Sequence, residues 1–129
     1  GMAVSELRAQ TVAVVDDGDT LVVAFSDADE REVLLLQRAA GFDDQDRQLG
    51  MDTYCLATAD QATVYGGVAS WSFDGSVLVL HLSDNAATAL SVERVVHVIV
   101  DGEAPADLKS AISKVLRQSA RPRSADTDR

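Results

Sequence analysis

The sequence predicts an α+β domain in which a mostly antiparallel β-sheet dominates over helices. About seven runs of β-branched and aliphatic residues follow one another along the chain, each of a length typical of a strand. Short turns containing Asp and Gly join several of these runs, and such turns connect antiparallel strands. Near the C-terminus, apolar residues instead recur at helical spacing. We therefore expect one sheet packed with one C-terminal amphipathic helix and one short helix.

The first part of the chain predicts three strands separated by two turns. Aliphatic and β-branched residues dominate 11–15 and 21–25. The segment 16–19, DDGD, lies between them and is typical of a hairpin, because Gly supplies the positive φ that tight turns need. The polar segment 26–31 predicts the next turn. Residues 32–38, EVLLLQR, then predict a central strand, since several consecutive apolar residues indicate burial on both faces.

A long polar connection, residues 39–51, separates this strand from the middle of the chain. At most a single helical turn is expected in it, and long loops on a folded scaffold often carry function. Residues 52–59 and 63–73 then predict two strands. The pair Gly66-Gly67 inside the second run indicates a bulge, a bend or the close approach of another backbone.

The last two strands are predicted at 76–82 and 93–100, where Leu and Val alternate on two faces. An Asp-Gly hairpin turn precedes the first of them. Between the two strands, Ser83 or Asp84 can cap a short helix that continues to Leu90. The segment therefore predicts a strand, a short helix and a strand in that order.

The C-terminal helix is predicted to start at Pro105, because the missing N–H of Pro costs nothing in the first turn of a helix. Its apolar positions are Leu108, Ala111, Ile112, Val115 and Leu116. Residues 118–129 are polar and without periodicity, which predicts a disordered tail. We therefore expect a single domain over residues 2–117.

The charge of the chain is unevenly distributed. Its formal net charge is −10, but residues 1–108 contain 19 Asp and Glu against 5 Lys and Arg, a net charge of −14. Such a field repels nucleic acid and membrane surfaces and speeds encounter with a basic protein, although solubility alone also favours an acidic surface. No run approaches the roughly 18–20 apolar residues of a membrane span. The absence of a signal-peptide pattern and the single Cys are compatible with the cytoplasm.

The residue types that could support catalysis are few. Cys55 lies in an acidic domain, which would raise the pKa of its thiol, and a small buried apolar role is the simpler interpretation. His81 and His97 lie on predicted strands but have none of the spacings that bind metals. The aspartate-rich segments lack the Gly and Glu positions of a calcium loop. We expect no enzyme activity, no metal and no cofactor.

Three short motifs follow one another in the middle of the chain: LQR ending at Arg38, LGMDTY at 49–54 and YGGV at 65–68, with Trp71 close behind. In this order and spacing they resemble the bacterial immunity protein 10 family of polymorphic toxin systems. The resemblance extends over roughly residues 20–100. It implies a non-enzymatic cytoplasmic protein that binds and neutralises the toxin domain of its own strain. The expected partner is therefore a protein, and neither nucleic acid nor a membrane.

The family pattern does not assign the residues that contact a toxin, so candidates come from the chain itself. Carboxylates suit a basic toxin such as a nuclease, and interface hot spots are enriched in Tyr and Trp. The aromatic candidates can equally belong to the core, which has few other large residues. The candidate partner-binding residues are Asp43, Asp44, Asp46, Asp52, Tyr54, Tyr65 and Trp71.

Two other functions remain open. The first is a small enzymatic or ligand-binding domain, which requires that Cys55, His81 and His97 line one pocket. The second is assembly of a homodimer or larger oligomer through the edges of the sheet.

Overall fold

The fold is α+β, as the sequence predicts. The computed structural model describes residues 4–39, 41, 44–48 and 53–117. The strands are β1 (Val4–Ala9), β2 (Thr11–Asp16), β3 (Thr20–Ser26), β4 (Glu32–Ala39), β5 (Cys55–Thr58), β6 (Thr63–Tyr65), β7 (Val68–Phe73), β8 (Val77–Leu82) and β9 (Val92–Val100). The helices are α1 (Asp44–Gln48), α2 (Asp84–Leu90) and α3 (Leu108–Leu116). The predicted tail, 118–129, lies outside the described residues.

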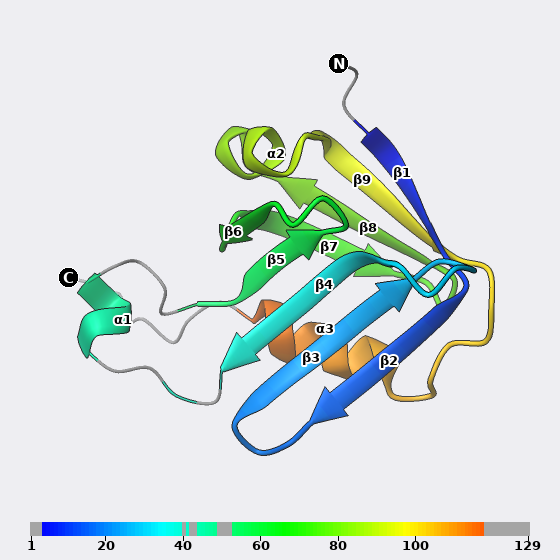
Figure 1. Ribbon diagram of the computed structural model, residues 1–129, viewed down its shortest axis with the longest axis horizontal. Coiled ribbons are helices and arrows are strands. Elements are labelled where there is room, and N and C mark those ends of the chain that lie inside the picture. Colours follow the sequence, from blue (N-terminus) through cyan, green and yellow to red (C-terminus); the bar gives the residue numbers. More distant parts are fainter. Residues whose placement is uncertain (1–3, 40, 42–43, 49–52, 118–129) are drawn as a thin grey trace.

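The strands form two sheets rather than the one expected. The five-stranded sheet has the order β2-β3-β4-β5-β6 and is antiparallel throughout. The four-stranded sheet has the order β1-β9-β8-β7, in which β1 pairs parallel to β9 and the other pairs are antiparallel. In Figure 1 the five-stranded sheet faces the viewer, α3 lies behind it, and α2 lies at the top beside β8 and β9.

The described chain has two more strands than predicted. β1, with the sequence VSELRA, has no clear apolar alternation. Of its residues only Ala9 lies in the core, and Leu7 packs against it. It is a strand because it pairs with the distant β9, which local pattern cannot reveal. The other extra strand arises at Gly66-Gly67, where the predicted run 63–73 divides into β6 and β7.

The core lies between the inner faces of the two sheets and is closed by α2 and α3. The two inner faces meet directly, since Leu34 and Leu56 from one sheet and Leu80 and Leu82 from the other surround a space of about 10 Å³. Ile112 of α3 is fully buried in the same core. The core is therefore built mainly from Leu, Val and Ala. No helix in the described part of the chain is both long and apolar enough to span a membrane.

The chain changes sheet between β1 and β2 and again between β6 and β7, and the pair Gly66-Gly67 is the joint of this second passage. Gly66 has φ +72° and Gly67 has φ +96°, so both occupy the left-handed region. A Cβ atom on Gly67 would lie 2.5 Å from the Cβ of Ala86 in α2. Of the predicted alternatives, the bend is confirmed, whereas the close neighbour is a helix side chain and not another backbone.

Helix α2 begins beside this joint. Ser83 accepts a hydrogen bond from the Ala86 N–H at 3.1 Å, so of the two predicted N-cap candidates it is Ser83 that caps α2. The Ser83 N–H in turn donates to the Gly67 carbonyl at 2.8 Å. The start of α2 is therefore tied to the bend by backbone hydrogen bonding as well as by packing.

Helix α3 begins at Leu108 rather than at Pro105, whose carbonyl instead accepts from the Leu108 N–H in a preceding turn. At its other end, the Arg38 guanidinium of β4 donates to the carbonyls of Val115 and Arg117, at 2.8 and 2.5 Å. These are carbonyls that a helix end leaves without intrahelical partners. Arg38 thus fixes α3 against the five-stranded sheet. Burial and the neighbouring Arg117 charge lower the pKa of Arg38.

Tyr54 joins the two motifs that flank the joint. Its hydroxyl accepts from the Val68 N–H at 2.8 Å, and its carbonyl accepts from the Gly66 N–H at 2.9 Å. The Tyr54 side chain is only 3% exposed, and this burial raises its pKa. The LGMDTY and YGGV motifs therefore meet in one structural element.

Replacing Tyr54 by Phe tests this element. The variant leaves the buried Val68 N–H without its acceptor, so we expect a loss of about 1–3 kcal/mol in the free energy of unfolding. Urea unfolding followed by circular dichroism measures the loss. Tyr65→Phe is the matched control, because the Tyr65 side chain is exposed; equal stabilities of the two variants would contradict the role given to the Tyr54 hydroxyl.

Candidate protein-interaction surface

The outer face of the five-stranded sheet presents two rows of uncharged side chains. The strand registers align one residue from each strand in each row. The first row is Val15, Val22, Gln37, Cys55 and Tyr65, and the second row is Ala13, Ala24, Leu35, Ala57 and Thr63. Gln37 and Thr63 are the two polar members, and neither row contains a charged residue. We call these ten residues the apolar outer face.

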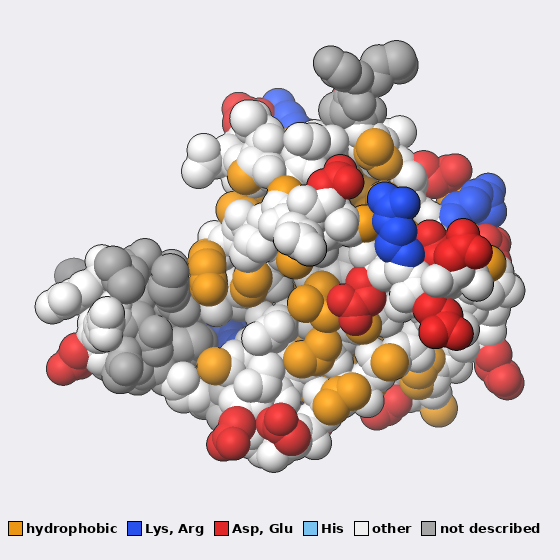
Figure 2. All heavy atoms as spheres, in the orientation of Figure 1, with side chains coloured by type: hydrophobic (Ala, Val, Ile, Leu, Met, Phe, Trp, Pro, Cys, Tyr) orange, Lys and Arg blue, Asp and Glu red, His pale blue; other side chains and the backbone are white. Residues whose placement is uncertain are grey.

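None of the described helices covers the apolar outer face. Helix α3 contacts β3 and β4, and its buried side chains join the core on the opposite side of the sheet. Val15 is 53% exposed and Tyr65 is 44% exposed, which is high for large apolar side chains on a sheet. Figure 2 shows apolar side chains gathered over the front of the five-stranded sheet. Contiguous exposed apolar patches of this kind mark interaction surfaces.

Acidic groups lie at both ends of the apolar outer face. The β2–β3 hairpin carries Asp16, Asp17 and Asp19 at one end. The β3–β4 turn and the start of β4 carry Asp27, Asp29, Glu30 and Glu32, with Arg31, at the other end. Red side chains border the orange ones below and on the right in Figure 2. An apolar centre with a charged border is the usual anatomy of a protein–protein interface.

The hairpin that carries Asp17 is well ordered by its own carboxylate. The Asp17 carboxylate accepts from the N–H groups of Thr20 and Asp19, at 2.8 and 2.9 Å. These hydrogen bonds lower the pKa of Asp17, so its charge is fully present at neutral pH.

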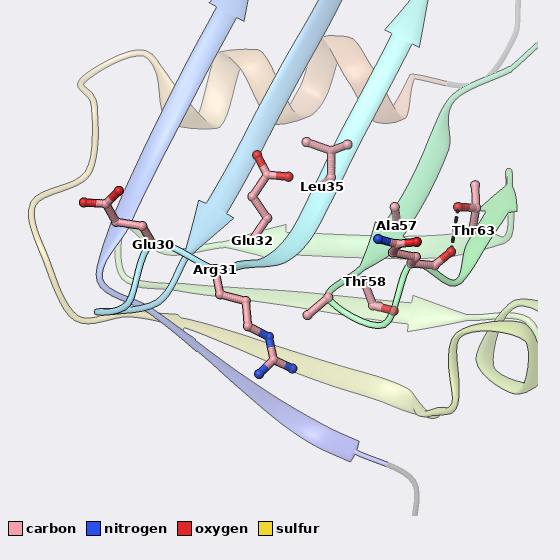
Figure 3. A pocket seen from close by; sticks show the side chains of 9 residues that line it. Glu30, Arg31, Glu32, Leu35, Ala57, Thr58 and Thr63 are labelled. Carbon is pink, nitrogen blue, oxygen red and sulfur yellow. Dashed lines mark hydrogen bonds between the residues drawn. The ribbon is translucent and has the colours of Figure 1, made fainter.

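A hollow of about 490 Å³ opens at the end of the apolar outer face, between the start of β4 and the β5–β6 turn. Its lining includes the apolar Leu35 and Ala57 and the charged Glu30, Arg31 and Glu32. Figure 3 shows Glu32 and Leu35 on the same side of β4, with Arg31 pointing away from them. The dashed line there is the hydrogen bond from the Thr63 hydroxyl to the Gln61 carbonyl.

The outer face of the four-stranded sheet has a different composition. Its longest row, across all four strands, is Glu6, His97, Val79 and Ser72. Arg8 lies on the same face and donates to Asp101 at 3.2 Å, within 3.6 Å of Glu6. This face mixes both signs of charge with polar groups, which is typical of a solvated surface.

The acidic candidates cannot be placed as a group. Asp44 lies at the start of α1 and is exposed. Asp43 and Asp52 lie outside the described residues, and so does the side chain of Asp46. Their predicted role in binding a partner stays a prediction.

The three aromatic candidates have three different environments. Tyr54 is buried, which corresponds to the core alternative that the sequence left open. Tyr65 is exposed on the apolar outer face. Trp71 is half-buried on the inner side of β7 and lines a hollow of about 370 Å³ together with Ser113 and Leu116 of α3. Of the three aromatic candidates, Tyr65 is therefore the one best placed to contact a partner.

The three residues of the enzymatic alternative do not form one site. Cys55 lies on the outer face of the five-stranded sheet and is half-buried, which raises the pKa of its thiol. His81 and His97 are exposed on the outer face of the other sheet, each opposite a Val on the neighbouring strand. Among the described residues, no group of three or more His, Cys, Asp or Glu side chains is arranged to hold a metal ion.

The family model for Immunity protein 10 matches residues 7–108. The chain belongs to the Immunity protein 10 family. This confirms the resemblance drawn from the three motifs, and the match reaches further toward both ends than those motifs do. Searches of curated proteins and of solved structures returned no significant match.

The structure assigns different roles to the motifs by which the Immunity protein 10 family is recognised in this chain. Arg38 of LQR holds the end of α3, while Tyr54 and Gly67 form the joint between the sheets. These residues determine the fold. Gln37 and Tyr65, from the same motifs, point outward on the apolar outer face. The matched segment contains all of the apolar outer face but ends where α3 begins.

Proposed function

We propose that the protein is a non-enzymatic immunity protein that binds one cognate toxin domain in the cytoplasm and blocks its activity. The observation that carries the proposal is the match to the Immunity protein 10 family over most of the chain. The proposed partner is a protein. Binding it requires no nucleic acid, no membrane and no cofactor.

The charge of the chain supports a basic toxin domain, for example a nuclease. Residues 1–108 have a net charge of −14, and acidic groups border the apolar outer face at both ends. Complementary charge accelerates the encounter of two proteins and disfavours wrong partners. The predicted candidates Asp43, Asp44, Asp46 and Asp52 would add to the same attraction.

The separation of Cys55 from His81 and His97 favours binding over the enzymatic alternative. A nucleophile and its base must lie within hydrogen-bond reach, and these side chains belong to two different sheets. A role in binding requires no such constellation.

Co-expression tests the proposal in cells. We expect the cognate toxin domain to be encoded beside this gene. That domain is expressed from an inducible promoter, with and without the wild-type chain. We expect toxin expression alone to reduce colony counts by about a thousandfold or more, and the chain to restore them, because a tight inhibitor removes free toxin by mass action. A catalytically inactive toxin domain serves as the control for expression burden. Loss of viability despite abundant folded chain would count against the proposal.

A further inference from the structure

The apolar outer face exposes large side chains without a partner in the described chain. Val15 and Tyr65 stand at opposite ends of the first row, and Leu35 lies in the second row between them. Leaving such a surface in water costs free energy that a partner would recover on docking. Eight of the ten residues are apolar and none is charged, so the centre of this face offers contact area without charges to desolvate.

We propose that the apolar outer face is the surface on which the toxin domain docks, through an apolar centre of the toxin bordered by Lys and Arg. This inference rests on the proposed function and adds to it the surface and the chemistry of the partner. The acidic groups at both ends of the face, Asp16 to Asp19 and Asp27 to Glu32, match a basic border in charge.

The hollow at the end of the apolar outer face indicates which kind of toxin side chain would fit there. Glu32 places a carboxylate on the same side of β4 as Leu35, and Ala57 lines the same hollow. A long basic side chain suits this combination, because its methylene stem packs on apolar surface while its charged head meets the Glu32 carboxylate. One Lys or Arg of the toxin enters this hollow.

A second copy of the chain fits the face less well. Two copies would bring their acidic borders together, and like charges across an interface oppose association. The outer face of the other sheet is also a poorer candidate, because Glu6 and Arg8 already give it mixed and partly paired charge.

Two exposed valines provide a matched test. Val15 lies on β2 in the apolar outer face, and Val95, 38% exposed, lies on β9 in the outer face of the other sheet. Val15→Lys and Val95→Lys make the same change at an exposed, outward-facing position of each sheet. Binding to the purified toxin domain is measured by calorimetry, after thermal unfolding has shown that each variant is folded.

We expect Val15→Lys to raise the Kd by about tenfold or more, because it sets a positive charge on the apolar outer face opposite a basic partner. Val95→Lys should leave the Kd within about threefold of wild type. Tyr65→Ala is a second, independent variant, and we expect it to raise the Kd by about tenfold or more since exposed Tyr anchors are frequent hot spots. Glu32→Gln should weaken binding more at low salt than at high salt.

The possible outcomes separate this inference from the proposed function. Wild-type binding with no effect of Val15→Lys or Tyr65→Ala overturns the docking surface and leaves the proposed function intact. An effect of Val95→Lys alone moves the interface to the other sheet. A wild-type homodimer in light scattering that Val15→Lys dissociates assigns the face to a second copy and overturns the inference. No binding by the folded wild-type chain removes the proposed function itself.

Discussion

Gly67→Ala is expected to lower the free energy of unfolding by about 2–5 kcal/mol. Two costs combine at this position. A φ of +96° disfavours any residue with a Cβ atom, by about 1 kcal/mol or more. The new Cβ would also lie 2.5 Å from the Cβ of Ala86, so α2 must move away from the joint, at an overpacking cost of about 1–3 kcal/mol. Chemical unfolding followed by circular dichroism measures the sum.

Gly18→Ala is the matched control for the first of these costs. Gly18 has φ +90°, close to that of Gly67, but a Cβ atom there would meet nothing within 4 Å. The difference between the two variants therefore isolates the contact with α2. The double variant Gly67→Ala, Ala86→Gly should recover part of that difference, as a double-mutant cycle requires for residues in contact. Equal losses for Gly67→Ala and Gly18→Ala would contradict the packing of α2 on the joint.

Ile112→Ala is expected to cost about 2–5 kcal/mol, the usual range for emptying a large buried aliphatic site. Ile112 is fully buried in α3, and its helix covers the inner side of β3 and β4. Helix α3 lies almost entirely beyond the family match, which ends at residue 108. The result therefore also decides whether α3 is needed for the stability of the domain. A large loss makes α3 an integral part of the domain.

Ser110→Ala is the control for this variant. Ser110 is exposed on the same helix, so we expect its replacement to change the free energy of unfolding by less than about 0.5 kcal/mol. A loss below about 1 kcal/mol for Ile112→Ala would indicate that α3 contributes little to the folded core. Both values come from the same urea titrations.

The local elements of the fold could be predicted because their signals are local. The DDGD hairpin, the Ser83 cap and the bend at Gly66-Gly67 each follow from the chemistry of neighbouring residues. The existence of two sheets could not be predicted in this way. An alternating strand shows that it has an inner and an outer face, but the pattern does not say which strands lie beside it. β1 illustrates the limit, since its partner β9 lies some ninety residues away.

The candidate site was harder to predict than the fold. Four consecutive apolar residues in β4 indicated burial on both faces, yet Leu35 is half-exposed on the outer side. Periodicity cannot distinguish a strand covered on both sides from one that awaits a partner, because both need apolar residues on both faces. Tyr65 was predicted for its residue type, whereas Val15 and Leu35 become candidates only through the cross-strand register.

Calorimetric titration of the wild-type chain into the purified toxin domain encoded beside its gene tests the central claim most directly. We expect a 1:1 complex with a Kd of about 10 nM or tighter at low salt, which weakens by about tenfold or more when salt screens the acidic surface. Size-exclusion chromatography of the mixture should show the same complex. The absence of both binding heat and a co-eluting complex, with each protein folded, would contradict the claim.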